Sequence, residues 1–394
     1  MGACAAVMTG PGAGAIATIE LHGRSAAAAL DGIFKSSADK PLELTPGSVV
    51  LGHVVDGEAI LDQVTLGCEA PDVFAIHCHG NPLIVERIME LLQRRGIELV
   101  SAEQLLARTL ADRYPDNAIA VEAKLALTTV KTIAGARLIA YQVDGGLAQR
   151  VRQWQQCLEA GRWESIREEA SQVLRDSEPA RLIISGCTIV LIGPPNTGKS
   201  TLLNALAGRE KALVTDVKGT TRDWVSAEIH IPPLAATVID TAGLDADLAA
   251  ADQDGVDRAA QAGSIEIVAQ ADIVLLVLDA GRPASQLDAG LVERLAGKRI
   301  VTVLNKSDLP PHCDAASLPE PLRPAVPISA KQQTGIPNLI QAIHQAFNVT
   351  DFDHHTSIAF TLRQLRLLDG LSHSSSKEKA VLLVTELFEG SLSV

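Results

Sequence analysis

The sequence predicts an α/β protein in which a domain with a doubly wound parallel sheet is inserted into a helical domain and preceded by a small α/β domain. Three observations predict this arrangement. Strand, loop and helix patterns repeat from 182 to 347, strand-like and helical pieces alternate before about 105, and helical patterns flank the repeats. Short apolar runs rich in Val and Ile, each followed by a polar loop, are typical of parallel strands buried on both faces.

The length, composition and charge of the chain fit several folded domains. Its 394 residues exceed the size of one compact core, so two or three domains are expected. Hydrophobic residues make up 47% and charged residues 21%, which is typical of a folded chain. The formal charge of −13 argues against a broad basic face that coats nucleic acid, so any RNA contact must be local.

The cysteines and the N-terminus indicate the compartment. The six cysteines are scattered without a CxxC pair, which favours a reducing compartment over a disulfide framework. No Lys or Arg precedes Arg24, so a signal peptide's charged start is absent, and no apolar run approaches about 20 residues. Ala6 stands where a myristoylation signal requires Ser or Thr. We expect a cytoplasmic protein that does not enter a membrane.

The predicted domain boundaries follow these patterns. Residues 1–107 alternate strand-like pieces such as AIATIELHG with the helical piece NPLIVERIMELLQRRG. Residues 108–181, largely helical from 117 to 178, and residues 348–394 form a helical domain in two parts, which we expect to pack on each other. Residues 182–347 contain the strands CTIVLIG, ATVIDTAG, DIVLLVLDAG, RIVTVLNKSD and AVPISAK. In such sheets ligands bind at the carboxyl ends of the strands, where the polar motifs fall.

The first motif is GPPNTGKS, residues 193–200, which fits GxxxxGK[ST] directly after a strand and at the start of a helix. In this P-loop pattern, backbone amides hold the phosphates, Lys199 reaches the β and γ oxygens, and the Ser200 hydroxyl binds Mg²⁺. The alternative, a purely structural glycine-rich turn, is disfavoured by the flanking strand and helix. The residues predicted to bind nucleotide here are Gly193, Asn196, Thr197, Gly198, Lys199, Ser200 and Thr201.

Two downstream motifs indicate which nucleotide is bound. In DTAG, Asp240 suits a direct or water-mediated Mg²⁺ ligand, and the Gly243 amide suits the γ-phosphate. In NKSD, Asp308 can accept hydrogen bonds from the N1 and N2 groups of guanine, a donor pair that adenine lacks. Each motif alone is weak, and NKSD alone is more often an exposed turn, but their order predicts a GTP-binding G domain. The predicted base pocket comprises Asn305, Lys306, Asp308, Ser329, Ala330 and Lys331.

Between these motifs lies GTTRD, residues 219–223. A threonine here can reach Mg²⁺ and sense the γ-phosphate, which would order the segment only in the triphosphate state. We favour Thr221 over Thr220 for this role, although spacing alone does not decide between them. A loop without function is the alternative.

The segments GPPNTGKSTLLNALAG, ALVTDVKGTTRDW and DTAGL closely resemble the tRNA modification GTPases of the MnmE/TrmE family. TGPGAGAIATIELHG and IHCHGNP are similar to two segments of that family's N-terminal domain. The resemblance implies a tetrahydrofolate-binding N-terminal domain, a G domain inserted into a helical domain, and a homodimer formed through the N-terminal and G domains. It also implies tRNA and a flavoprotein of the MnmG/GidA type as partners.

Leu244 follows DTAG, where many nucleotide hydrolases have a water-orienting glutamine. The resemblance implies that a bound potassium ion replaces an arginine finger and that a distant acid orients the water. That acid aligns with Asp252, where the family has glutamate; because misplacement by about 1 Å can cost about a hundredfold, a solvated surface acid is the alternative. The potassium ligands that the resemblance implies are Asn196, Thr215, Val217 and Thr220.

Several sequence features depart from the pattern of the family. The chain ends LFEGSLSV and has no cysteine after Cys313, whereas the family ends in Cys-x-Gly-Lys. Glu20 stands where a basic residue is expected near the folate, which argues against binding of 5-formyltetrahydrofolate. ADRYPDNAIAVEA replaces the family's FLNGKLDL-like segment.

Residues 77–79, His-Cys-His, are not expected to bind metal, because adjacent residues of a strand point to opposite faces.

The main hypothesis is a potassium-assisted GTPase of the tRNA wobble-uridine modification type, with Lys199, Thr221 and Asp252 as catalytic residues. It would convert GTP to GDP and phosphate while a dimer of G domains opens and closes. The alternative is a divergent GTP-binding regulatory paralogue that no longer takes part in tRNA modification. A ribosome-assembly GTPase is disfavoured, because no basic RNA-binding appendage follows the G domain.

Overall fold

The computed structural model describes residues 2–10, 12–37, 44–208, 214–216, 225–240, 267–287 and 289–390. Its contacts divide the chain into two compact units, and along the sequence the division falls between Val121 and Glu122. The predicted domain boundaries after residues 107, 181 and 347 stay predictions. Within the described ranges, no helix is both long and apolar enough to cross a membrane.

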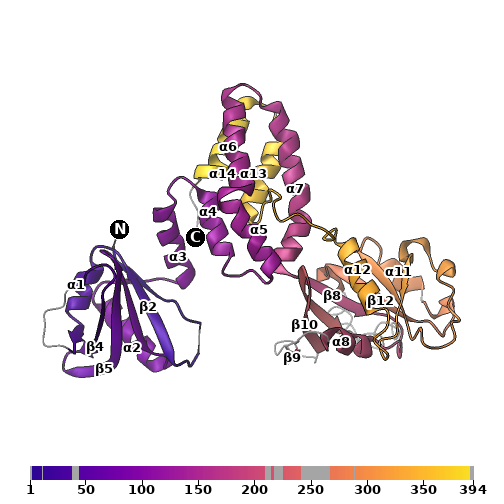
Figure 1. Ribbon diagram of the computed structural model, residues 1–394, viewed down its shortest axis with the longest axis horizontal. Coiled ribbons are helices and arrows are strands. Elements are labelled where there is room, and N and C mark those ends of the chain that lie inside the picture. The colour runs from indigo at the N-terminus through magenta and orange to yellow at the C-terminus, as the bar shows by residue number, and fades with distance from the viewer. Residues whose placement is uncertain are drawn as a thin grey trace, which may run out of the picture. The chain divides into compact units, whose positions relative to one another are not determined.

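The N-terminal unit is built on a sheet of seven described strands in the order β3-β4-β5-β6-β2-β1-β7 (Figure 1). Helix α2 begins after Asn81, whose side chain accepts a hydrogen bond from the Leu83 amide. Its buried Ile88 joins Phe74 and Ile76 of the sheet in one hydrophobic core. The elements are β1 (Cys4–Val7), β2 (Ile16–His22), α1 (Ala26–Asp31), β3 (Phe34–Ser36), β4 (Val49–Asp56), β5 (Ala59–Ala70), β6 (Val73–His79), α2 (Pro82–Arg94), β7 (Glu98–Leu99) and α3 (Ala102–Arg113).

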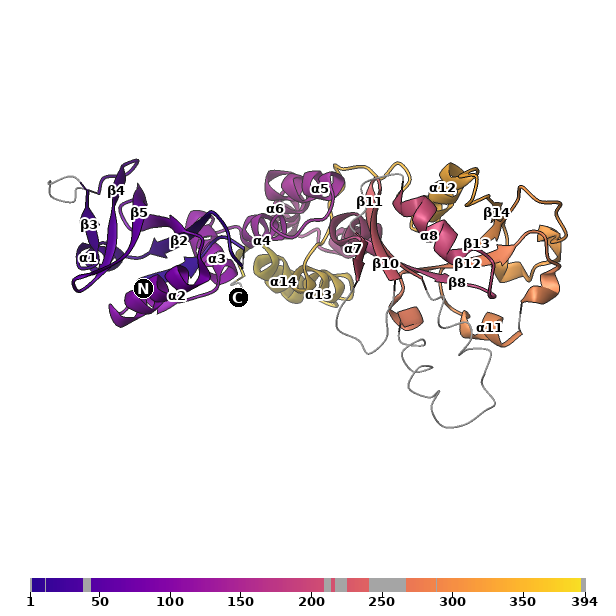
Figure 2. The ribbon, with the colours of Figure 1, turned by 90° about the horizontal axis from the view of Figure 1, so that it is seen from below.

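The helical part of the second unit is formed by two segments that lie far apart in the sequence. Helix α13 packs against α7 and α14 against α6, as the sequence predicts (Figure 2). Gln142 is fully buried and accepts hydrogen bonds from the Leu147 and Ile358 amides, so it ties the returning chain to α5. The helices are α4 (Ala118–Ala126), α5 (Ile133–Asp144), α6 (Gly146–Glu159), α7 (Glu164–Ser185), α13 (Leu362–Ser372) and α14 (Lys377–Glu389).

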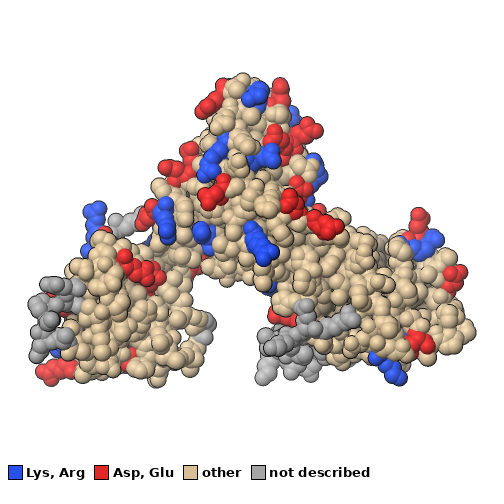
Figure 3. Space-filling view, viewed as in Figure 1, with Lys and Arg blue, Asp and Glu red and all other residues tan. Residues whose placement is uncertain are grey.

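Two features of this bundle bear on the sequence analysis. The sequence predicts helix to about residue 178, but α7 continues through Pro179 to Ser185. Proline removes one backbone hydrogen bond there, and the burial of Leu182 and Ile183 offsets that loss. On the face drawn in Figure 3, basic and acidic side chains are intermixed over the bundle.

The sheet of the second unit has seven described strands in the order β14-β13-β12-β8-β11-β10-β9. The five strands from β14 to β11 pair in parallel, as the sequence predicts. Strand β10 was not predicted and pairs antiparallel with β11. The elements are β8 (Cys187–Ile192), α8 (Lys199–Ala207), β9 (Val214–Asp216), β10 (Val225–Ile231), β11 (Leu234–Asp240), β12 (Ile273–Asp279), η1 (Ala284–Gln286), α11 (Ala289–Arg294), β13 (Ile300–Asn305), η2 (Ala315–Ser317), η3 (Glu320–Leu322), β14 (Ala325–Pro327) and α12 (Ile336–Ala346).

Candidate nucleotide-binding site

The loop between β8 and α8 depends on two glycines. Gly193 has a φ of 152°, and a Cβ at this position would overlap the carbonyl oxygen of Val277 on β12. Gly198 has a φ of 92°, and a Cβ there would press into the side-chain amide of Asn305. Glycine alone tolerates both conditions without strain, so the loop conformation requires the glycines of the GxxxxGK pattern.

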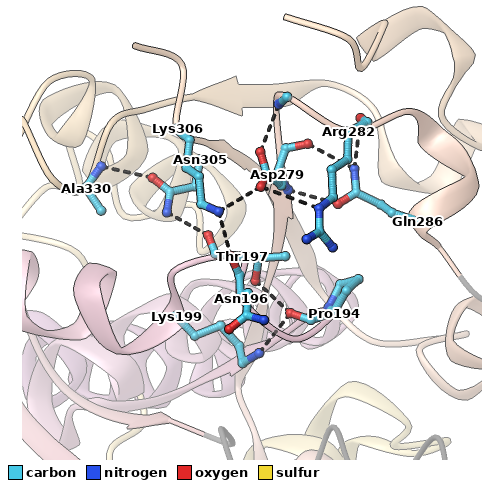
Figure 4. A network of polar contacts seen from close by, with 11 residues as sticks. Pro194, Asn196, Thr197, Lys199, Asp279, Arg282, Gln286, Asn305, Lys306 and Ala330 are labelled. Carbon is cyan, nitrogen blue, oxygen red and sulfur yellow. Dashed lines mark hydrogen bonds and ion pairs between the residues drawn. The ribbon is translucent and has the colours of Figure 1, made fainter. Parts of the chain in front are cut away.

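Lys199 lies against the inside of this loop and is only 5% exposed. Its Nζ donates hydrogen bonds to the carbonyl oxygen of Gly193, at 2.8 Å, and to that of Pro194, at 3.2 Å. Figure 4 shows the bond to Pro194. Ser200 and Thr201 are exposed in the first turn of α8, where the amides of a helix N-terminus attract anions. The loop therefore brings an ammonium group, a helix N-terminus and two hydroxyls to one place, an arrangement suited to phosphate.

Asn305, the last residue of β13, connects the phosphate loop to the loop after β14. Its side-chain nitrogen donates to the carbonyl oxygen of Thr197 at 2.8 Å, and its side-chain oxygen accepts from the Ala330 amide at 2.9 Å (Figure 4). Asn305 is 2% exposed, so these bonds are shielded from water. The backbone of Ser329 pairs with that of Thr334, which shapes the loop that Ala330 belongs to. The NKSD motif therefore contacts the phosphate loop directly, and the SAK motif is joined to that loop through Asn305.

The other predicted residues of the base pocket lie around Asn305. Lys306 has a φ of 64°, and its Nζ donates to the carbonyl oxygen of Asn196 at 2.6 Å. Asp308 and Lys331 are exposed, which leaves their charged groups accessible to a ligand. Asn196 is also exposed and has a φ of 62°, in the left-handed region that asparagine tolerates.

Asp240 is the last residue of β11 and is 5% exposed. Its Cα lies in register with Leu191 on β8, the strand that leads into the phosphate loop. The carboxyl ends of these two parallel strands meet at the same edge of the sheet. Asp240 therefore lies on the edge that carries the phosphate loop, where the sequence places it.

The side chains of the remaining predicted residues of the G domain are not described by the structure. Thr215 lies in β9, for which only the backbone is described. The predicted residues that lie outside the described ranges are Val217, Thr220, Thr221, Gly243, Leu244 and Asp252.

The sequence analysis missed Asp279, the last residue of β12, which is 6% exposed. One carboxylate oxygen accepts from Lys306 Nζ at 2.7 Å and the other accepts from the Gly281 amide at 2.9 Å. Burial by itself raises the pKa of this carboxyl, but the hydrogen bonds and the positive charges of Lys306 and Arg282 outweigh burial and hold the pKa below its usual value. Its place after a parallel strand, in DIVLLVLDAG, is the signal that could have identified it.

Two features of the N-terminal unit were also singled out in the sequence. Glu20 Oε1 lies 2.6 Å from His22 Nε2, within hydrogen-bond distance, so Glu20 already has a partner on its own strand. His79 Nδ1 lies 2.7 Å from Asp62, whereas the Cys78 thiol donates to the Ala17 carbonyl. His79 and Cys78 thus engage separate partners rather than a common centre.

Comparisons with known proteins match both regions. Residues 188–306 match the family described as 50S ribosome-binding GTPase, and residues 3–104 match the family described as GTP-binding protein TrmE N-terminus. The tRNA modification GTPase MnmE of Bacillus subtilis (strain 168) is 30% identical over 88% of this chain and 83% of its own length. MnmE of Clostridioides difficile (strain 630) is 28% identical over 97% of this chain and 89% of its own.

A solved structure also aligns with part of the chain. The G domain of FeoB from Methanococcus jannaschii is 27% identical and covers 41% of this chain and 98% of that domain, with a TM-score of 0.30. The two family matches and the likeness to MnmE proteins over most of the chain agree with the phosphate loop and its partners at the ends of β13 and β14. The chain belongs to the MnmE/TrmE family and is a GTPase.

Proposed function

We propose that this GTPase acts in tRNA wobble-uridine modification and that its hydrolysis of GTP is assisted by K⁺ in a dimer of G domains. The observation that carries the nucleotide site of this proposal is the junction at Asn305, where the phosphate loop and the loop after β14 are joined by buried hydrogen bonds. A site connected in this way can bind base and phosphates as one unit. Relatives over most of the chain are named tRNA modification GTPases, which supports the proposed process.

The proposed roles follow from the donor chemistry of each residue. The Lys199 ammonium compensates the charge of the β- and γ-phosphates, and the Ser200 hydroxyl and Asp240 carboxylate are oxygen ligands suited to Mg²⁺. Mg²⁺ held by these residues would supply positive charge to the phosphates. Thr221 is proposed as a further Mg²⁺ ligand, and Asp252 as the acid that orients the attacking water. Lys199→Ala should abolish hydrolysis, whereas Asp252→Ala should slow turnover and leave GTP binding intact; unchanged turnover would make Asp252 a surface acid.

Potassium is proposed to bind hard oxygen donors from Asn196, Thr215, Val217 and Thr220. Asn196 suits this role because its side chain is exposed while its backbone carbonyl is held by Lys306. The proposal predicts that GTP turnover in KCl exceeds turnover in NaCl at equal ionic strength. Equal rates in the two salts would contradict potassium assistance and leave GTP binding untouched.

The proposed partners are tRNA and a flavoprotein of the MnmG/GidA type, with a homodimer as the working form and the cytoplasm as the compartment. Folate is not among the proposed ligands, because an acidic residue, Glu20, stands where the resemblance implies a basic residue for a carboxylate ligand. Expression in a bacterial strain that lacks wobble-uridine modification tests the process. Mass analysis of the tRNA wobble uridines should show the modification restored.

The second candidate is a GTP-binding regulatory protein that no longer modifies tRNA. It is favoured by the Glu20–His22 pair at the position expected to serve folate and by an aspartate at position 252. Under this candidate the same strain would contain active GTPase but unmodified wobble uridines. The two functions are thus separated by one experiment.

A further inference from the structure

Asp279 carries a buried carboxylate whose two oxygens each accept a different donor. Oδ2 accepts from Lys306 Nζ at 2.7 Å, and Oδ1 accepts from the backbone amide of Gly281 at 2.9 Å. Gln286 brackets the same residue, since its side-chain oxygen accepts from the Asp279 amide and its side-chain nitrogen donates to the Asp279 carbonyl. The carboxylate is therefore held in one position by its own loop.

The Lys306 ammonium is shared between this carboxylate and the phosphate loop. Its Nζ also donates to the carbonyl oxygen of Asn196 at 2.6 Å, so the lysine spans from β13 to the phosphate loop (Figure 4). Arg282 approaches the same Asp279 oxygen only at 3.8 Å and is half exposed, so it is the weaker partner. The four-carbon stem of a lysine held at its tip presents an apolar edge along which a purine can pack.

We propose that Asp279 is a positioning residue for guanine nucleotide binding, because it fixes the Lys306 ammonium at the phosphate loop and keeps the lysine stem extended beside the base pocket. The inference rests on the proposed guanine nucleotide site. Asp279 acts through Lys306 and does not itself touch the nucleotide. Lys306 belongs to the predicted base pocket, which GDP and GTP share, so the loss should affect both nucleotides equally.

Asparagine at position 279 preserves the shape of the side chain but not its bonding. An amide has one acceptor oxygen, whereas Asp279 accepts a donor on each of two oxygens. Whichever way the amide is turned, its NH₂ group faces either the Gly281 amide or the Lys306 ammonium, both of which are donors. Loss of a hydrogen bond between charged groups of this kind predicts about a tenfold weaker binding of nucleotide.

The experiment compares Asp279→Asn with Glu320→Gln. The control also replaces a carboxylate by an amide, but at an exposed position of the same unit. Stopped-flow measurements with a fluorescent GDP should show dissociation about tenfold faster in Asp279→Asn, with association unchanged and no change in Glu320→Gln. The KM for GTP should rise by the same factor, while kcat at saturating GTP stays within about twofold. A fall in kcat without a change in KM would overturn the proposal.

A double-mutant cycle with Lys306→Met tests whether Asp279 acts through the lysine. Methionine retains an apolar chain without the ammonium, so Asp279→Asn added to Lys306→Met should weaken binding no further. Losses that multiply in the double variant would overturn the proposal. If thermal melting shows that Asp279→Asn does not fold, Asp279→Ser replaces it in the cycle, since its smaller side chain fits the same space.

The proposed function fails separately from this inference. If the unaltered protein does not bind GDP, the guanine site itself is wrong. If it binds GDP and Asp279→Asn binds equally well, the site stands and Asp279 has no positioning role.

Discussion

The side-chain nitrogen of Asn305 lies 2.8 Å from the carbonyl oxygen of Thr197, which joins the end of β13 to the phosphate loop. Asn305→Ala removes this bond and the one from the Ala330 amide. The buried Thr197 carbonyl and the buried Ala330 amide then lose their hydrogen bonds to the Asn305 side chain. Each such loss costs about 1–3 kcal/mol, so we expect GDP affinity to fall at least about tenfold. Titration of GDP into the variant measures the loss.

Asn338→Ala is the matched control for that prediction, because Asn338 is exposed on α12 and lies outside both loops. It should bind GDP like the unaltered protein. Equal affinity in Asn305→Ala and the unaltered protein would show that the junction does not support the nucleotide site.

Gly193→Ala tests the conformation of the phosphate loop. A methyl group at this position would meet the Val277 carbonyl oxygen at a φ of 152°, which an L-residue rarely adopts. We expect loss of GDP binding, measured by fluorescent GDP, together with a lower melting temperature. Gly10→Ala is the control, since nothing lies within 4 Å of its added methyl group and no change is expected.

Glu122 and Arg363 form the most shielded ion pair of the described helical bundle. The Glu122 oxygens accept from Arg363, Thr361 and Gln364, and Glu122 is 6% exposed. Arg363→Ala leaves this carboxylate without its cation and should lower the free energy of unfolding of the bundle by about 3 kcal/mol. Urea unfolding followed by the fluorescence of buried Trp154 on α6 measures it.

The exposed pair of Arg87 and Glu90 supplies the contrast. Glu90→Ala should change the free energy of unfolding by less than about 1 kcal/mol, because solvent screens exposed pairs. If Arg363→Ala is as mild as Glu90→Ala, the Glu122 network does not hold the bundle together.

Two buried thiols should resist alkylation. Burial raises the pKa of Cys187 to about 12, and burial with the charge of Asp62 raises that of Cys78 to about 11. At pH 8 both remain thiols, which are poor nucleophiles, whereas the partly exposed Cys157 should react first with iodoacetamide. Mass spectrometry of timed samples distinguishes the sites, and early labelling of Cys187 would contradict its burial.

The same raised pKa values predict how stability depends on alkaline pH. Above the pKa of an unfolded thiol, about 8.5, the unfolded chain loses protons that the folded chain keeps at Cys78 and Cys187. Their contribution to stability is complete below that pH and falls as the pH rises towards 11 and 12. Cys187→Ala should therefore flatten the decrease in melting temperature between pH 8 and pH 10.

The parts of the fold that repeat a strong local pattern could be predicted from the sequence. The buried strands β8, β11 and β13 are short apolar runs, and Asp240 and Asn305 lie at their carboxyl ends because parallel strands end at one edge. The phosphate loop could be predicted because Gly193 and Gly198 stand at positions whose positive φ angles disfavour other residues.

Other parts were missed for different reasons. Strand β10 alternates buried Ala227 and Ile229 with exposed Glu228, a pattern of one covered face that differs from the continuous apolar runs on which the strand prediction was based. The role of Asp279 depends on Lys306, which follows it by a long stretch of chain and reaches it only in the folded sheet. Tertiary packing likewise extends α7 beyond Pro179.

Calorimetric titration of the purified protein with GDP and with ADP, in the presence of Mg²⁺, examines the guanine site most directly. We predict saturable binding of GDP at one site per chain and no measurable heat of binding with ADP. Heat from ADP equal to or greater than that from GDP, or none from either nucleotide, would contradict it.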